Sequence, residues 1–183
     1  MLNVSTKTGD KGVSSLANGR RIPKDSVLFD ALGTLDELNS WLGMVVASMP
    51  ARKRAFMAQK KVLLHIQDML FYLGAEVAQS PKVEFSQQEL LDLEAVSDSL
   101  QQSMAEGWAM QFRLPGGTPV AAQIDVARSV CRRAERELVR TSHEYELRPL
   151  LLKYLNRLSD YLFVLRCFVN LELGYSEKLF SAK

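Results

Sequence analysis

An arginine-rich segment, Arg-Arg-Ala-Glu-Arg at 132–136, lies in the middle of a helical pattern and has the groups to bind an anion. At 100° per residue, Arg128, Arg132 and Arg136 fall within about 80° of one another and form a stripe with Asp125. A guanidinium matches a phosphate or a carboxylate with two parallel hydrogen bonds. The stripe therefore predicts either a polyphosphate or carboxylate site or, as on most charged helix faces, a merely solvated surface.

The N-terminal segment also carries groups that bind phosphate. It reads Thr-Lys-Thr-Gly-Asp-Lys-Gly-Val-Ser-Ser at 6–15, so glycines, lysines, hydroxyls and a carboxylate lie close together. Such a loop can surround phosphates with its N–H groups, with Asp or Ser beside a magnesium ion. It is not a Walker A loop, because Gly-x-x-x-x-Gly-Lys-[Ser/Thr] is absent. Taken alone, the segment is more simply a polar terminus, and Lys24 part of a solvated basic turn.

Three further side chains each allow two interpretations. Asp36 either pairs with an arginine of the stripe-bearing helix or lies on the surface. Asn156 either binds a base or ribose or makes a contact between two helices. Phe112 precedes a Pro-Gly-Gly sequence at 115–117, so it is either a core residue or a plug or lid over a ligand.

The histidines and cysteines disfavour two kinds of catalysis. Neither His65 nor His143 has a Glu three residues before it, so the Glu-x-x-His pairs of a di-iron bundle are missing. No cysteine spacing suits a tightly held transition metal. No local Ser-His-Asp or Cys-His signature indicates a covalent intermediate.

Hydrophobic periodicity predicts five amphipathic helices that would position these residues. Pro50 and Pro81 end the first two, Ser86 and Glu89 form a capping box for the third, and Pro149 begins the fifth. Short connections and no credible strand pattern predict an all-α fold. We expect an antiparallel five-helix bundle with an irregular N-terminal nucleotide-binding loop. The expected helices cover 26–49, 52–79, 86–107, 119–143 and 149–173.

The length indicates one domain over 1–183. Within it we expect a loop at 1–25, the bundle at 26–173 and a loosely held C-terminal tail at 174–183. The chain has 23 Lys and Arg against 21 Asp and Glu, so its net charge of +2 gives no bulk field for nucleic acid or an anionic membrane. An anion site must therefore be local.

Cysteine usage and the N-terminal composition indicate the compartment. Cys131 and Cys167 lie in apolar helical surroundings without a CxxC pair, so both are expected to be buried free thiols in a reducing environment. The first residues lack the apolar run of a signal peptide, and no apolar run reaches membrane-spanning length. A cytoplasmic protein is expected.

Five segments in order resemble the PduO-type ATP:cob(I)alamin adenosyltransferases, the corrinoid adenosyltransferase family. They span nearly the whole chain, and five ordered matches are far more specific than any one. The segments are Thr6–Gly12, Gly33–Ser40, Phe112–Gly117, Val126–Arg136 and Leu155–Phe163.

The resemblance implies a homotrimer of five-helix subunits in which ATP and the corrinoid meet at subunit interfaces. Arg128 would pair with Asp36 of a neighbouring subunit, and Phe112 would occupy the lower face of the corrinoid and displace its axial base. These three residues and Arg132 form the implied catalytic set. The implied ATP ligands are Thr6, Lys7, Thr8, Gly9, Ser14, Lys24, Arg132, Arg133, Glu135, Arg136 and Asn156.

The implied reaction is displacement at the 5′ carbon of ATP by the cobalt of cob(I)alamin. Triphosphate leaves and adenosylcobalamin forms, with Mg²⁺ expected on the ATP phosphates. Cob(I)alamin is itself the nucleophile, so the protein needs only to position two reactants and stabilise a departing polyanion. A flavoprotein reductase and a cobalamin-dependent mutase are the implied partners.

Four features depart from the family pattern. Ser5 stands where an aromatic residue is common, Val13 where Thr is frequent, and Ala17-Asn18 where glycine is frequent. Arg113 replaces the usual aliphatic residue and would contact either a corrin amide or water. Two other functions stay open: a non-catalytic cobalamin carrier or chaperone of the same fold, and a helical scaffold whose charged stripes are solvated or trimer-forming.

Overall fold

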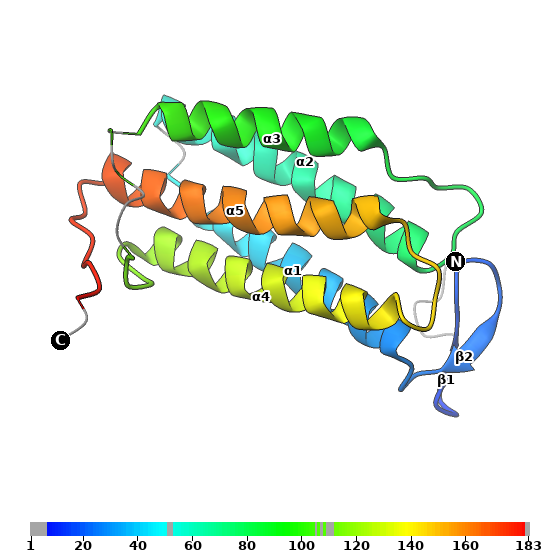
Figure 1. Cartoon of the computed structure of the whole chain (residues 1–183). Coiled ribbons are helices and arrows are strands. Elements are labelled where there is room, and N and C mark those ends of the chain that lie inside the picture. Colours follow the sequence, from blue (N-terminus) through cyan, green and yellow to red (C-terminus); the bar gives the residue numbers. More distant parts are fainter. Residues whose placement is uncertain (1–6, 51–52, 105, 107, 109–111, 182–183) are drawn as a thin grey trace, which may run out of the picture.

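Five α-helices packed side by side make the body of the molecule (Figure 1). The computed structural model describes residues 7–50, 53–104, 106, 108 and 112–181. The expected all-α five-helix bundle is confirmed, and only the third helix ends clearly earlier than its pattern predicts. The helices are α1 (Val27–Ser48), α2 (Arg54–Val77), α3 (Gln87–Gln102), α4 (Pro119–Thr141) and α5 (Pro149–Glu172). None of the helices in the described ranges combines the length and apolar character that a bilayer span requires.

Local sequence signals set the helix starts. The hydroxyls of Ser26, Ser86 and Thr118 accept hydrogen bonds from the first-turn N–H groups of α1, α3 and α4. The capping-box prediction is right about the start of α3 but wrong about Glu89. Its carboxylate lies 2.6 Å from His65 Nε2 and so joins α3 to α2.

A two-stranded hairpin precedes the bundle, and the expectation of an irregular N-terminal loop without strands is wrong here. Strand β1 (Val13–Ser15) pairs antiparallel with β2 (Arg21–Pro23), so that Ser14 lies opposite Ile22. Each strand has only three residues and the second ends in proline, so no alternation long enough to detect exists. The hairpin buries Ile22 and docks on the bundle through the Ala17 N–H, 3.0 Å from the carbonyl of Ala78.

Both cysteines are buried and unpaired, which confirms the expectation of free thiols. Burial raises the pKa of the Cys131 thiol far above its ordinary value. Burial also raises the pKa of Cys167, to about 11. Both side chains are therefore thiols at neutral pH, and neither is an activated nucleophile.

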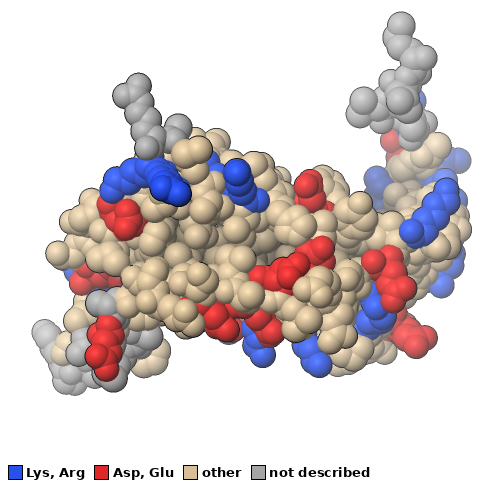
Figure 2. Space-filling model, turned by 90° about the horizontal axis from the view of Figure 1, so that it is seen from above, with Lys and Arg blue, Asp and Glu red and all other residues tan. Residues whose placement is uncertain are grey.

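Helix α3 gives one face of the molecule an acidic character. It carries four carboxylates, Glu89, Asp92, Glu94 and Asp98, and no lysine or arginine. Figure 2 shows acidic side chains along the face seen from above, where α2 and α3 lie. The arginines of α4 lie on the other side of the bundle, where α1 packs against α4.

One ion pair ties the start of α5 to α2. Arg148 donates from Nε to Glu76 Oε1 (2.6 Å) and from a terminal nitrogen to Oε2 (2.7 Å). Burial raises the pKa of Glu76, but hydrogen bonds from Arg148 and the Phe85 N–H outweigh this and hold it below its ordinary value. The pair therefore stabilises the fold fully above the ordinary pKa of the carboxyl and less as the pH falls through the lowered value.

We expect Glu76→Gln to lower the free energy of unfolding by about 2 kcal/mol at pH 7, because it breaks charge-assisted hydrogen bonds. Urea unfolding at pH 7 and pH 3 checks this, and the difference from wild type should shrink at the lower pH. Glu84→Gln is the matched control, because the Glu84 side chain bonds the same arginine but is 81% exposed. A difference that stays the same at both pH values would contradict the assignment.

Candidate functional site

A groove of about 550 Å³ runs along the face formed by α1 and α4. It extends from the arginine-bearing part of α4 to the loop that follows Phe112. The structure thus brings the arginine helix and this loop to one continuous surface. Its lining includes Glu37, Trp41, Pro115, Gly116, Arg133 and Arg136.

The arginines of α4 divide into bound and available side chains. Arg133 forms an ion pair with Glu37 of α1, and Arg128 Nε lies 4.0 Å from the Asp125 carboxylate. Arg136 donates to the main-chain carbonyl of Arg132, 3.2 Å away. Within the part of the chain that the structure describes, no side chain or carbonyl bonds the exposed guanidinium of Arg132, so it is available to a ligand.

Asn156 lies beside this stripe on α5. Its Nδ2 donates to Glu135 Oε1 (3.1 Å), and its Oδ1 accepts from Arg157 (2.9 Å). In the single chain it therefore makes the contact between two helices that was one of its interpretations. The Glu135–Asn156 bond also places both side chains next to the arginines, where the family pattern expects nucleotide ligands.

The N-terminal phosphate-binding candidates lie around the hairpin. Lys24 packs over Gly9, because a Cβ on that glycine would stand 2.9 Å from the lysine Nζ. Ser14 lies in β1, and the Thr8 carbonyl accepts from Arg21 (2.7 Å). These contacts gather an ammonium, a hydroxyl and a glycine backbone at one end of the bundle.

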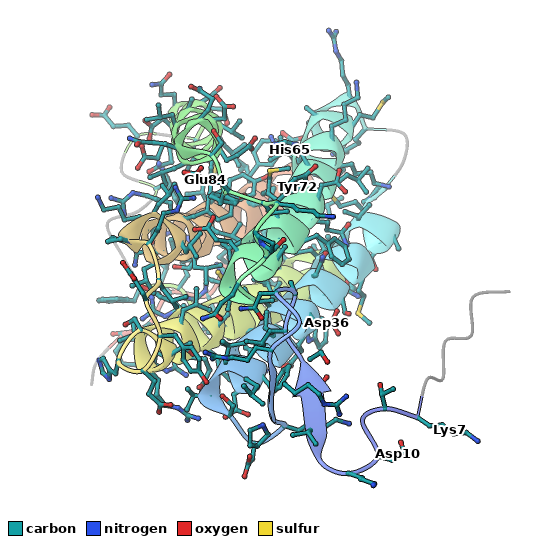
Figure 3. All side chains as sticks on the ribbon, turned by 90° about the vertical axis from the view of Figure 1, so that its right-hand side faces the viewer. Lys7, Asp10, Asp36, His65, Tyr72 and Glu84 are labelled. Atoms are coloured by element: carbon teal, nitrogen blue, oxygen red, sulfur yellow. The ribbon has the colours of Figure 1, made fainter. Side chains whose placement is uncertain are left out.

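Residues 7–12 form a loop that the hairpin holds through Arg21 and Lys24. Figure 3 shows Lys7 and Asp10 on a loop that stands off from the helices. Lys7 adopts a left-handed φ of 56°, which is uncommon for a residue with a side chain. Thr6, another expected ATP ligand, lies outside the described residues.

One chain does not assemble the whole expected site. The hairpin lies at the end of the bundle opposite the start of α4 (Figure 1). Residues 119 to 132 rise about 20 Å along that helix, so the loop before α4 is far from the phosphate-binding candidates. Asp36 lies exposed on α1 (Figure 3), and the nearest carboxylate that Arg128 contacts is Asp125 of its own helix.

Phe112 is 85% exposed, although it belongs to a tightly held loop. The Gly116 N–H donates to Asp125 Oδ2 (2.7 Å), and the Thr118 N–H donates to Asn170 Oδ1 (2.9 Å). Gly117 has a φ of 109° and lies so close to the Asn170 amide that a Cβ would overlap it. A fixed loop that exposes a phenylalanine offers a flat apolar surface to a ligand.

The same loop contacts the end of the chain, so the expectation of a loosely held tail is wrong for residues 174–181. The Leu114 N–H donates to the Lys178 carbonyl (2.9 Å), and the Phe180 N–H donates to the Phe112 carbonyl (2.8 Å). Arg113 forms an ion pair with Glu177 and lies over the Trp108 ring. In this structure the guanidinium of Arg113 faces the protein. The prediction named only a corrin amide or water as its contact and did not include Glu177.

Three polar residues behind the loop, the buried Arg166 and Asn170 and the partly buried Glu177, were not predicted. Arg166, Asn170 and Glu177 hold it from inside, and Asp125, expected in the arginine stripe, belongs with them at 7% exposure. A signal existed in the sequence, because Arg166 interrupts a long apolar stretch of the fifth helix. A charge in such a place is almost always paired.

Together the fold and the site define a helix-bundle protein for two ligands, one phosphate-bearing and one with a flat apolar face. The chain belongs to the cobalamin adenosyltransferase family, whose model matches residues 4–169. It is 39% identical to a cobalamin adenosyltransferase of Cupriavidus metallidurans, over 96% of this chain and 92% of the relative. It is 35% identical to the corrinoid adenosyltransferase of Bacillus subtilis, over 96% and 91% of the two chains.

Solved structures agree with this family. A variant PduO-type ATP:corrinoid adenosyltransferase from Lactobacillus reuteri, complexed with cobalamin and ATP, superposes with a TM-score of 0.90 at 30% identity. The match covers 98% of this chain and 100% of the Lactobacillus reuteri chain. A further variant of that enzyme, complexed with ATP, gives a TM-score of 0.86 at 30% identity over 98% and 100% of the two chains. The predicted family is confirmed.

Proposed function

We propose that this protein transfers the 5′-deoxyadenosyl group of ATP to the cobalt of cob(I)alamin, giving adenosylcobalamin and triphosphate. The observation that carries the proposal is the continuous groove from the arginines of α4 to the loop that exposes Phe112. Arg133 and Arg136 line one end of it, and Pro115 and Gly116 of the loop that exposes Phe112 line the other, so an anion site and an apolar surface lie along one face. Family membership supplies the reaction that uses both.

The available guanidinium of Arg132 and the neighbouring Arg136 bind the triphosphate of ATP. The hairpin end supplies a lysine and backbone N–H groups for the same phosphates, in the manner of a phosphate-binding loop. Glu135 and Asn156 position the nucleoside beside the arginines. The other proposed ATP ligands are Thr6, Lys7, Thr8, Gly9, Ser14, Lys24 and Arg133.

In the proposed reaction the cobalt lone pair forms a bond to C5′ of ATP. The C5′–O bond breaks, and its electron pair leaves with the triphosphate. Arginines already oriented toward the phosphates stabilise the charge that develops on this leaving group. The buried thiols Cys131 and Cys167 and the histidines take no part, because the corrinoid supplies the nucleophile.

Mg²⁺ enters, in this proposal, on the phosphates of ATP. Among the described residues, no group of three or more His, Cys, Asp or Glu side chains could hold a metal ion by itself. Magnesium commonly binds through substrate phosphates and keeps several waters, so a protein cage is not required. The ion would add to the charge that the arginines supply.

Phe112 lies, in this proposal, against the lower face of the corrinoid. A phenyl ring cannot coordinate cobalt, so it keeps an axial base or water away from the metal. Removal of the lower ligand favours the reduced cobalt state that attacks ATP. Its 85% exposure leaves the ring free to make this contact.

We further propose a homotrimer in which each site forms between two subunits. The loop before α4 and the N-terminal hairpin lie at opposite ends of one chain, so a neighbouring copy must complete the site (Figure 1). The exposed Asp36 of one subunit would then pair with Arg128 of the next. A flavoprotein reductase and a cobalamin-dependent mutase fit as upstream and downstream partners, and two unpaired cysteines fit the cytoplasm.

The test is anaerobic incubation of the protein with ATP, Mg²⁺ and chemically reduced cobalamin. We expect the cob(I)alamin spectrum to be replaced by that of a light-sensitive alkylcobalamin, at a rate proportional to protein concentration. Bound cobalamin without conversion would indicate a carrier of the same fold. If cobalamin is neither bound nor converted, the helical scaffold is the function that remains.

A further inference from the structure

A buried polar cluster joins the end of the chain to the Phe112 loop. Arg166 of α5 is 1% exposed and reaches three different segments. It donates from Nε to Asp125 of α4 (3.1 Å), from one terminal nitrogen to Glu177 (2.6 Å) and from the other to the Leu114 carbonyl (2.8 Å). One side chain thus holds a helix, the C-terminal segment and the loop in fixed relation.

Asn170 repeats this arrangement one turn further along α5. It is fully buried, and its Oδ1 accepts from the N–H and the hydroxyl of Thr118 (2.9 and 3.1 Å). Its Nδ2 donates to the Gly116 carbonyl (3.0 Å) and to Glu177 Oε1 (2.9 Å). Every hydrogen-bonding group of this amide is therefore used to hold either the loop or the C-terminal segment.

Glu177 is the point at which these bonds converge. Its carboxylate accepts from Arg166 and Asn170 and also forms an ion pair with Arg113, the residue next to Phe112. The Glu177 side chain is only 12% exposed, so its charge is held by these partners and not by water. Loss of that charge would remove the one carboxylate that Arg166, Asn170 and Arg113 share.

The main chain makes a second connection beside the first. Residues 178–180 lie antiparallel to residues 112–114, with a bridge between Arg113 and Leu179. The bond from the Phe180 N–H ends on the carbonyl of Phe112 itself (2.8 Å). The C-terminal segment therefore holds the backbone of the residue whose ring is exposed.

We propose that the segment Tyr175–Phe180 is a strap that sets the position of Phe112 against the corrinoid, with Glu177 as its positioning residue. The proposal rests on the proposed function, because it concerns the ring that displaces the axial ligand. Glu177 does not touch a substrate in this account. It acts through the loop, so its effect depends on the presence of the Phe112 ring.

The test is a double-mutant cycle in the full-length chain with Glu177→Gln, Phe112→Ala and the combination. We expect Glu177→Gln to lower kcat at least about 10-fold when Phe112 is present and less than about 2-fold in the Phe112→Ala background. The dissociation constant for ATP should stay within about 2-fold of wild type. Equal losses in both backgrounds would show that Glu177 only supports the fold and would overturn the proposal.

A spectroscopic readout separates positioning from general weakening. Electron paramagnetic resonance of cob(II)alamin bound with ATP shows nitrogen superhyperfine splitting when an axial base coordinates the cobalt. We expect this splitting to be absent with wild type and to appear with Glu177→Gln, with Glu177→Asp between the two. A Glu177→Gln spectrum identical to wild type would contradict the strap.

A surface variant keeps the proposal testable should Glu177→Gln fail to fold. Phe180→Pro removes the N–H that bonds the Phe112 carbonyl, while Phe180→Ala removes the same ring and keeps that N–H. We expect the proline variant to be at least about 5-fold slower than the alanine variant, and equal rates would overturn the strap. Conversion by the wild-type protein is measured first, and its absence would reject the proposed function. If the wild type converts cob(I)alamin but the Glu177 and Phe180 variants give the contradicting results, only the strap is rejected.

Discussion

Replacing Arg132 by alanine is expected to lower kcat/KM for ATP at least about 100-fold, the scale of losing one oriented donor to a developing negative charge. The guanidinium is exposed and unbonded within the described chain, so its removal breaks no internal contact. The free energy of unfolding should therefore change by less than about 0.5 kcal/mol. Steady-state kinetics and thermal unfolding of the same preparation measure both quantities.

Two matched variants sharpen this result. Arg54→Ala removes the same charge from an exposed position on α2, and it should leave the rate within about 2-fold of wild type. Arg132→Lys keeps the charge but loses the planar pair of donors, so it should fall between wild type and alanine. An Arg132→Ala enzyme that retains most of its activity would remove this residue from the phosphate site.

Phe112→Ala is expected to lower kcat on the order of 100-fold with little change in ATP affinity, because the cobalt loses the group that excludes its lower ligand. The ring is 85% exposed, so truncation should not disturb the bundle. Rate measurements with saturating cob(I)alamin, together with ATP binding by calorimetry, separate the two effects. The loss should be larger when cob(II)alamin must first be reduced on the protein.

Phe71→Ala is the control for this variant, because Phe71 is 70% exposed on α2, outside the groove. Its rate should match that of wild type. Equal weakening of ATP binding and of turnover by Phe112→Ala would place the ring near the nucleotide instead of the corrinoid. That outcome would also remove the basis for the C-terminal strap.

The five helices were predictable because their signals are local and repeated. Each has a sustained apolar stripe, and the starts at Ser86, Pro119 and Pro149 follow from caps or prolines near the first turn. The hairpin was not predictable in this way. Three-residue strands give too few alternations, and the docking of Ala17 on Ala78 depends on residues far apart in the chain.

The ligand-facing residues were likewise easier to anticipate than the residues behind them. Arg132 and Phe112 belong to short motifs with chemical character of their own. The roles of Asp125 and Glu177 arise only when α4, α5 and the C-terminal segment meet at Arg166. In sequence, a polar segment such as 174–181 looks like a free end of the chain. Its fixed position follows from the buried guanidinium of Arg166, which pairs with Glu177 as well as with Asp125.

The central claim is that cobalt displaces triphosphate from C5′ of ATP on this protein. The most direct measurement is a single-turnover reaction under anaerobic conditions, with both products separated and quantified. We predict one adenosylcobalamin and one intact triphosphate for each ATP consumed, with no free adenosine. ATP hydrolysis to diphosphate or phosphate without a cobalt–carbon bond, or bound cob(I)alamin that never reacts, would contradict the account.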